Sequence, residues 1–247
     1  MSQYPVHIYN GVDALSRAAA QRWIELADQA IQARGQFHIA LSGGTTPRSL
    51  YERLTAPEFA GRVDWRHVHV WFGDERSVPP DHPDSNYRMA CEALLSHVPI
   101  PPTQVHRIEA EKDGAAQAYE ALITASIPSP VAGVAQFDLI LLGLGPDGHV
   151  ASLFPDTAIL QERIRQVAAV YVDKLNTWRI SLTLPVIDNA RHIMIFVAGA
   201  GKAEIMRQIL TEDPRTVPYP VQMIRPAGMF DWYLDAAAAQ ALPEAQP

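Results

Sequence analysis

The residue with the clearest potential for chemistry is a histidine that directly follows a glycine-rich turn. An apolar run at 137–142 leads into the turn Gly143-Leu-Gly-Pro-Asp-Gly148, and His149 comes next. An unperturbed histidine has a pKa of about 6.5, which suits a general base near neutral pH. Asp147 could orient this imidazole, although an Asp-Gly pair is also common in plain turns. We therefore predict that His149 is a catalytic base, with a supporting loop made of Gly145, Asp147 and Gly148.

The same turn matches the GxGxxG pattern of dinucleotide-binding proteins, so a nicotinamide cofactor has to be considered. Two prolines argue against it. Pro146 lies inside the turn, and Pro155 would limit the following helix to less than two turns, whereas a dinucleotide-binding helix is longer. We predict no nucleotide and no other cofactor.

A second glycine-containing turn, Ser42-Gly-Gly-Thr-Thr-Pro47, joins an apolar run to a predicted helix. Glycines let backbone N–H groups approach a ligand, and the N-terminus of a helix favours an anion. The alternative is a tight turn with a threonine cap. The Gly-Lys-Ser/Thr ending of a nucleotide P-loop is missing, so the turn predicts a phosphate site of another kind. Its candidate ligands are Ser42, Gly43, Gly44 and Thr45.

Four charged residues complete the candidate site. Asp74 and Arg76 follow an apolar run at 68–72 and could hold a water, a sugar hydroxyl or a carbonyl oxygen. The alternative for them is a surface ion pair. Lys202 is predicted at the start of a helix, where the helix dipole disfavours a cation, so it could serve an anionic ligand; the alternative is a solvated lysine. Arg179 is a further candidate for the same ligand.

The elements that must position these residues alternate between strand-like and helix-like segments. Extended segments are predicted at 37–41, 68–72, 105–108, 137–142, 167–172, 179–184, 192–198 and 230–234. Helices are predicted at 13–34, after Pro47, and at 85–97, 114–126, 201–210 and 236–242. This alternation predicts an α/β fold with a mainly parallel sheet and helices on both faces. Ligands of such sheets bind at the carboxyl ends of the strands, so the predicted loops should converge on one cleft.

Composition narrows the function classes. The chain has 247 residues, of which 48% are hydrophobic and 19% charged, as in globular domains. We predict one domain over 1–247, with a frayed tail at 243–247. A net charge of -7 argues against nucleic-acid binding. The single cysteine, Cys91, cannot form an internal disulfide, and the histidines lack metal-ligand spacing, so no metal is expected. The absence of a signal peptide or an apolar span predicts a cytoplasmic protein without a membrane partner.

Five stretches together resemble the 6-phosphogluconolactonase family. They are LSGGTTPRSLYERL (41–54), VWFGDERSVPPDHPDSNYRMA (70–90), FDLILLGLGPDGHVASLFP (137–155), WRISLTLPVIDNARHIMIFVAGAGKAEIM (178–206) and WYLDAAAA (232–239). The resemblance implies a modified Rossmann-like fold shared with glucosamine-6-phosphate deaminases. It also implies hydrolysis of 6-phospho-D-glucono-1,5-lactone, the second step of the oxidative pentose phosphate pathway, without a metal.

The resemblance implies a role for each candidate residue. His149 would activate a water for attack on the C1 carbonyl, and Asp74 and Arg76 would orient the reactants or stabilise the oxyanion. The sugar and phosphate would be held by Ser42, Gly43, Gly44, Thr45, Arg179 and Lys202. Which of Arg76, Arg179 and Lys202 binds phosphate remains open. Oligomeric state and the preference for the 1,5- over the 1,4-lactone are open as well.

Two other functions are compatible with parts of the sequence. Aminosugar-phosphate deaminases have a similar turn, but with a glutamate that assists the histidine where this chain has Phe154. Phenylalanine cannot transfer a proton, which disfavours a deaminase or isomerase. A non-catalytic sugar-phosphate sensor would need a DNA-binding or partner domain, for which we expect no room, and it would not need the histidine.

Overall fold

The fold is built on a six-stranded sheet in which every strand runs parallel to its neighbours. The computed structural model describes residues 4–129, 133–211 and 219–243. The strands of this sheet are β1 (Val6–Tyr9), β2 (Phe37–Leu41), β3 (Val68–Phe72), β5 (Leu139–Gly143), β8 (His192–Val197) and β9 (Met229–Asp235). Apart from His38 in β2, strands β2 and β5 are apolar, and both are almost wholly buried, as expected of central strands covered on both faces.

The strand order places a switch point between β2 and β5. The order is β1-β9-β8-β5-β2-β3, so the chain proceeds from β2 to β3 in one direction and from β5 through β8 to β9 in the other. Loops at the carboxyl ends of two such strands diverge and leave a crevice between them. The two glycine turns of the sequence follow β2 and β5, and therefore flank this crevice.

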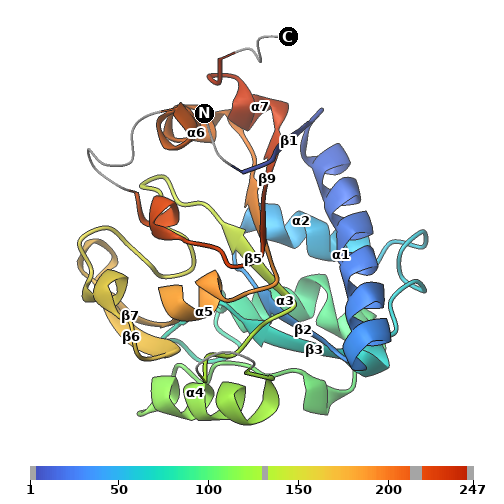
Figure 1. The fold of residues 1–247 in the computed structure, drawn as a ribbon, viewed down its shortest axis with the longest axis vertical. Helices are drawn as coiled ribbons and strands as arrows, with labels where there is room; N and C mark the ends of the chain where they lie inside the picture. Colours follow the sequence, from blue (N-terminus) through green and yellow to red (C-terminus); the bar gives the residue numbers. More distant parts are fainter. Residues whose placement is uncertain (1–3, 130–132, 212–218, 244–247) are drawn as a thin grey trace.

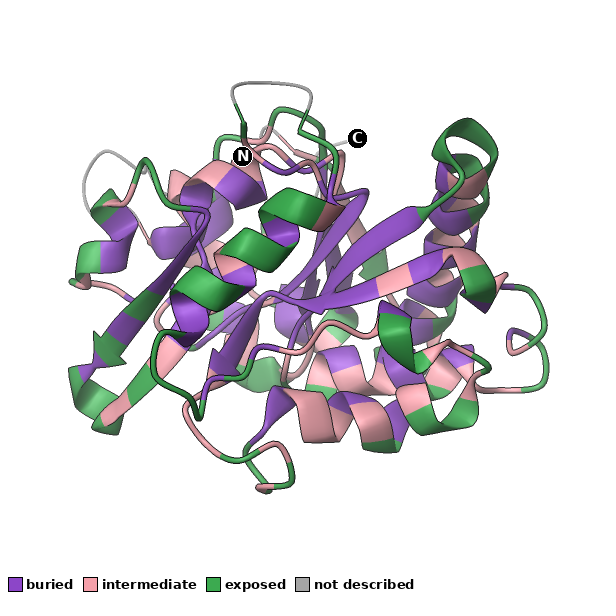
Figure 2. Ribbon diagram, turned by 90° about the horizontal axis from the view of Figure 1, so that it is seen from below, coloured by how far each residue is buried: buried purple, intermediate pink, exposed green. Residues whose placement is uncertain are grey.

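Helices cover both faces of the sheet. They are α1 (Val12–Arg34), α2 (Thr45–Leu54), α3 (Asn86–Ala93), α4 (Ala115–Ser126), α5 (Leu184–Asp188), α6 (Ala203–Thr211) and α7 (Ala236–Ala239). Helices α1 and α2 lie on one side of the sheet, and α5 lies on the other with strands β6 and β7 (Figure 1). Figure 2 shows buried strands in the centre and helices whose outer faces are exposed. Gly35 ends α1 in the left-handed conformation, as the sequence predicts.

A small antiparallel sheet forms beside the main one. It contains β4 (Asp74–Arg76), β7 (Thr177–Leu182) and β6 (Val167–Val172), in the order β4-β7-β6. Residues 74–76 were predicted to end the preceding strand, but they form a strand of their own. They pair with β7 about a hundred residues later, and such long-range pairing leaves no mark in a local pattern.

Several predicted elements have different limits in the structure. The segment 105–108 is not a strand, and only Val105 makes a bridge, to Val70. The helix predicted at 85–97 is α3 followed by the 3-10 turn Leu95–His97. The extended segment at 179–184 is shifted, because Leu184 begins α5. Strand β1 was missed, since it has only four residues at the edge of the sheet.

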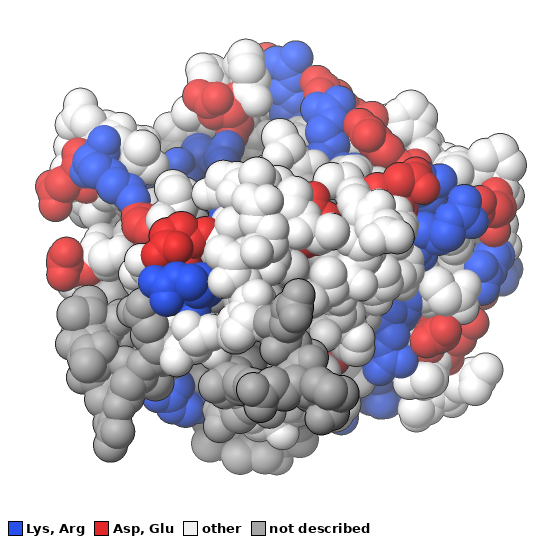
Figure 3. All heavy atoms as spheres, turned by 90° about the horizontal axis from the view of Figure 1, so that it is seen from above, with Lys and Arg blue, Asp and Glu red and all other residues white. Residues whose placement is uncertain are grey.

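The surface carries charges of both signs. Acidic and basic residues are interspersed over the face shown in Figure 3. None of the helices among the described residues is long and apolar enough to cross a membrane. Most of the tail predicted to fray, residues 244–247, lies outside the described part of the chain.

Candidate active site

A cavity of about 250 Å³ lies at the crevice between β2 and β5, and most of the predicted site residues line it. The predicted residues in its wall are Ser42, Gly43, Gly44, Thr45, Asp74, Arg76, Gly145, His149, Arg179 and Lys202. Asp147 and Gly148 lie behind the wall, in the supporting loop. Thr46 and Pro47 of the predicted phosphate turn also line the cavity, as do six residues that were not predicted for the site: Gly143, Leu144, Ala151, Phe196, Val197 and Ala198. The predicted convergence of distant loops on one cleft is therefore correct.

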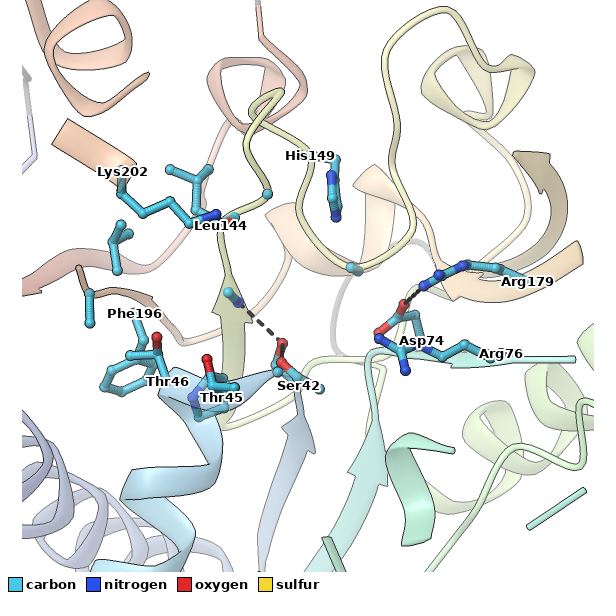
Figure 4. A pocket seen from close by; sticks show the side chains of 18 residues that line it. Ser42, Thr45, Thr46, Asp74, Arg76, Leu144, His149, Arg179, Phe196 and Lys202 are labelled. Atoms are coloured by element: carbon cyan, nitrogen blue, oxygen red, sulfur yellow. Dashed lines mark hydrogen bonds and ion pairs between the residues drawn. The ribbon is translucent and has the colours of Figure 1, made fainter. Parts of the chain in front are cut away.

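The imidazole of His149 is held on one nitrogen and on one face. Its Nδ1 lies 2.5 Å from a carboxylate oxygen of Asp147, and its ring stacks on Phe154 with centroids 3.9 Å apart. The ring points from its loop into the cavity, with 22% of the side chain exposed (Figure 4). Gly145 leaves the room that this ring needs, because a Cβ there would lie 2.0 Å from ring atoms. The proposed support of His149 by Asp147 thus has the required geometry.

The surroundings of His149 keep it neutral. Burial lowers its pKa to about 4; the nearby carboxylate of Asp74 opposes this effect, and the cations of Arg179, Lys202 and Arg76 reinforce it. A neutral imidazole carries one proton, and the carboxylate at Nδ1 favours placing it there. The lone pair of Nε2 is then free to accept a proton at neutral pH, as a general base requires.

Asp74 is a buried carboxylate with a defined set of partners. Its side chain accepts hydrogen bonds from Ser152 Oγ at 2.6 Å and from Asn86 Nδ2 at 3.1 Å, and Arg179 Nη1 lies 3.8 Å away. This residue is only 4% exposed, which excludes the alternative of a surface ion pair. Ser152 and Asn86 were not singled out from the sequence, although both lie in stretches that carry the family resemblance.

The two arginines approach the cavity from paired strands. Arg76 of β4 is directly opposite Arg179 of β7 in the antiparallel register. Arg76 donates through Nη1 to the carbonyl of Asp84, while the Nε atoms of both arginines are buried without a hydrogen-bond partner. These Nε atoms do not face the cavity, but both side chains line it, so other guanidinium N–H groups are suited to an oxygen-rich ligand.

Glu75, which lies between Asp74 and Arg76 in the sequence, has a structural role. Its carboxylate accepts hydrogen bonds from the backbone of Asn86 and Tyr87 at 2.8 Å and from Ser85 Oγ at 3.0 Å. Burial raises the pKa of Glu75, and these hydrogen bonds oppose the rise. The carboxylate thereby ties β4 to the start of α3, where Ser85 is the N-cap as predicted.

The turn after β2 presents the uncapped start of α2 to the cavity. Helix α2 begins at Thr45 after Gly44, whose φ of 103° favours glycine, and no side chain caps it. The alternative of a threonine cap is therefore wrong. Free N–H groups at a helix start are ready donors for an anion. Ser42 is engaged within the protein: its Oγ accepts from the Gly143 N–H and donates to the Gly43 carbonyl.

Lys202 approaches the same end of the cavity from the 3-10 turn Ala200–Lys202, which precedes α6. Its Nζ donates to the carbonyl of Leu144 at 2.7 Å. In Figure 4 it lies on the side of Thr45 and Thr46, whereas Asp74, Arg76 and Arg179 lie on the opposite side. The cavity therefore has two differently built ends, with His149 exposed to both.

The structure also bears on the cofactor alternatives. No helix follows the GxGxxG turn, because residues 149–157 form turns and an isolated bridge. The helix N-terminus that a dinucleotide would need is thus missing there. Within residues 4–129, 133–211 and 219–243, no group of three or more His, Cys, Asp or Glu side chains is arranged to hold a metal ion.

Comparison with known proteins identifies close relatives. The family model described as glucosamine-6-phosphate isomerases/6-phosphogluconolactonase matches residues 10–232. The chain is 38% identical over 214 residues to 6-phosphogluconolactonase of Haemophilus influenzae, an alignment covering 85% of this chain and 90% of the relative. It is similar to the solved structure of 6-phosphogluconolactonase from Trypanosoma brucei, with a TM-score of 0.87, 28% identity and coverage of 98% and 100%.

The predicted fold relationship with deaminases is confirmed as well. A monomeric glucosamine-6-phosphate deaminase superimposes with a TM-score of 0.79 over 96% of this chain and 99% of that chain, at 18% identity. An identity this low shows a shared fold and carries no information about activity.

Proposed function

This chain belongs to the family of glucosamine-6-phosphate isomerases and 6-phosphogluconolactonases, and we propose from this premise that it hydrolyses 6-phospho-D-glucono-1,5-lactone to 6-phospho-D-gluconate. This is the second step of the oxidative pentose phosphate pathway. The observation that carries the proposal is a neutral histidine, held by Asp147, in a cavity that also contains three cations. The proposal takes the chain as a single lactonase domain.

The reaction begins with water and His149. Nε2 removes a proton from a water molecule while the water oxygen forms a bond to C1 of the lactone. The carbonyl oxygen becomes an oxyanion, and collapse of this intermediate breaks the bond between C1 and the ring oxygen. The imidazolium returns its proton to that leaving oxygen, which becomes the C5 hydroxyl, and the new carboxylic acid ionises. General-base assistance of this kind typically supplies about 10²- to 10⁴-fold.

The end of the cavity that contains Asp74 is suited to the reacting carbonyl. The guanidinium groups of Arg76 and Arg179, which line the cavity, can stabilise an oxyanion there, where developing charge gains most from fixed donors. Asp74 is oriented by Ser152 and Asn86 and can accept a hydrogen bond from the attacking water or a sugar hydroxyl. Its charge also partly compensates that of Arg179.

The opposite end is suited to the 6-phosphate. The uncapped N-terminus of α2 and the ammonium of Lys202 both favour a dianion. The phosphate is remote from C1, so binding it anchors the substrate while the carbonyl reacts. We therefore assign Lys202 to the phosphate and the two arginines to the carbonyl, a choice that the sequence left open.

The structure gives the alternatives less support. Phe154 packs against the face of His149, so the position of the deaminase glutamate is filled by a ring that cannot transfer a proton. A sensor would bind 6-phosphogluconate but would not need a neutral, oriented base. A cytoplasmic location is part of the proposal, in keeping with the single cysteine, and cell fractionation would test it.

The test is a turnover assay. The lactone is generated in place from glucose 6-phosphate, and 6-phosphogluconate is followed with a coupled dehydrogenase for wild type, His149→Ala and a blank without enzyme. Wild type should exceed the blank by orders of magnitude, and His149→Ala should lose most of this turnover while still binding 6-phosphogluconate. The exposed His97 offers a control, His97→Ala, that should match wild type. If wild type does not exceed the blank, the lactonase proposal fails.

A further inference from the structure

A lysine outside the cavity contacts the two residues that hold His149. Lys174 lies in the 3-10 turn Asp173–Leu175 between β6 and β7. Its Nζ donates to Oδ2 of Asp147, while His149 uses Oδ1 of the same carboxylate. The carboxylate is thus fixed between a lysine and a histidine, one on each oxygen, and its plane is defined by both.

The same ammonium also lies over Phe154. Lys174 Nζ is 4.6 Å from the centroid of that ring, within the range of a cation–π contact. The ring of His149 stacks on Phe154 at 3.9 Å. Both contacts that orient the imidazole are therefore shared with Lys174. This lysine does not line the cavity, so a direct contact with substrate is not its role in this arrangement.

We propose that Lys174 is a positioning residue for the proposed lactone hydrolysis, acting on His149 through Asp147 and Phe154. The inference rests on the proposed function in one respect, that His149 is the base. Lys174 keeps Oδ1 of Asp147 directed at Nδ1, and this holds the Nε2 lone pair toward the cavity. The hairpin of β6 and β7 also carries Arg179, so one element positions both the base and a cation of the site.

Lys174 also has an electrostatic effect that can be measured. Its charge partly neutralises Asp147, whose carboxylate would otherwise stabilise the imidazolium form of His149. Without the lysine, the pKa of His149 should rise above its value of about 4, while burial, the main cause of the lowered pKa, remains. The other charges that surround His149 are Asp74, Arg76, Arg179 and Lys202, and they are unchanged by a substitution at position 174.

The experiment compares Lys174→Met, Lys174→Arg and Lys112→Met. Lys112 is an exposed lysine paired with Glu109, and it serves as the matched control. Lys174→Met should lower kcat about tenfold with little change in KM, since misplacing a base slows the chemical step. An NMR titration of the His149 ring, in protein without substrate, should move upward. Lys174→Arg should restore most of kcat, and Lys112→Met should match wild type.

Two results would overturn the proposal. If Lys174→Met raises KM and leaves kcat and the His149 titration unchanged, the lysine binds substrate instead. If none of these quantities changes, the contacts with Asp147 and Phe154 have no positioning role. The titration needs no turnover, so it separates the two hypotheses: an inactive wild type would refute the lactonase function, whereas an unshifted titration would refute the action of Lys174. Circular dichroism checks that each variant is folded.

Discussion

His149 and a stack of three other buried or half-buried histidines differ in their neighbours more than in their burial. His149 lies at the carboxyl ends of the strands, with a carboxylate on Nδ1 and cations around it. His38 of β2, His69 of β3 and His106 instead form a stack, with centroids of successive rings 4.7 and 5.5 Å apart. In this stack, His38 bonds to the indole of Trp71 and to Gln36, and His69 bonds to His106.

The two groups share a lowered pKa for the same main reason. Burial lowers the pKa of His149 and His106 to about 4 and that of His38 to about 3. A shifted pKa therefore does not by itself identify the base. The distinguishing features of His149 are the carboxylate that fixes its tautomer and the cavity that its ring enters. Substitutions that change one contact or charge at a time can test this difference between the two histidine groups.

The largest effect is expected from Asp147→Asn. Lys174 donates to the outer oxygen position, so the amide should place its oxygen there and its NH₂ toward Nδ1 of His149. The imidazole proton would then move to Nε2, and the base would be lost. We expect kcat to fall by about 10²- to 10⁴-fold.

The matched control for this change is Asp64→Asn. Asp64 lies 3.1 Å from Nδ1 of His67 on the surface, so it forms a similar pair away from the cavity. Its substitution should leave kcat unchanged. An Asp147→Asn protein with wild-type kcat would show that the carboxylate is dispensable and that the comparison between the two histidine groups is misleading.

The next largest effect is expected from Gly145→Ala. The new Cβ would lie 2.0 Å from Nδ1 and Cε1 of His149, so the ring must move. A displacement of about 1 Å can cost about 10²-fold, and we expect kcat/KM to fall by roughly this amount. Gly61→Ala is the control, because a Cβ there meets nothing within 4 Å. Full activity in Gly145→Ala would mean that the position of the ring is not critical.

The sequence was sufficient to predict where the candidate site lies in the fold. Apolar runs that end in glycine turns placed His149, Asp74 and the anion site at the ends of strands, and a parallel sheet brings such ends together. The residues that contact these side chains could not be predicted from the sequence. Ser152, Asn86 and Lys174 reach the site through pairings between distant segments, and side-chain contacts of this kind have no local periodicity.

The small antiparallel sheet could not be predicted from the sequence for the same reason. Residues 74–76 are too few to show alternation, and their strand exists because β7 pairs with them. Likewise, the stack of His38, His69 and His106 could not be predicted, since His106 lies outside any strand and contacts Trp71 at 3.9 Å only after folding. Local patterns predicted where the chemistry lies, and tertiary contacts determine how each group is held.

A smaller effect, confined to binding, is expected from Lys202→Met. If this lysine holds the 6-phosphate, its loss should raise KM about tenfold and leave kcat nearly unchanged. Steady-state kinetics with the phosphorylated lactone measures both constants, and Lys112→Met provides a control for the loss of one positive charge. A fall in kcat at constant KM would instead place Lys202 at the carbonyl end and reverse the assignment of the two ends of the cavity.

The smallest effect is expected on the stability of the protein, from a substitution of His106 in the histidine stack. The folded-state pKa of His106 is about 4, below the value near 6.5 expected when the chain is unfolded. Between these values the unfolded chain binds the proton and the folded protein does not, so the free energy of unfolding falls as the pH drops from about 6.5 to 4. His106→Gln should remove on the order of 1 kcal/mol of the loss between pH 7 and pH 5, a figure reduced for the partial exposure of the ring.

Urea unfolding at the two pH values tests this prediction. Glutamine also removes the stacking on Trp71, but that loss is the same at both pH values, so the difference between them isolates the titration. The exposed His97 supplies the control His97→Gln, whose pH dependence should match wild type. If His106→Gln keeps the wild-type pH dependence, His106 is protonated alike in both states. The two histidine groups would then differ in electrostatics as well as in neighbours.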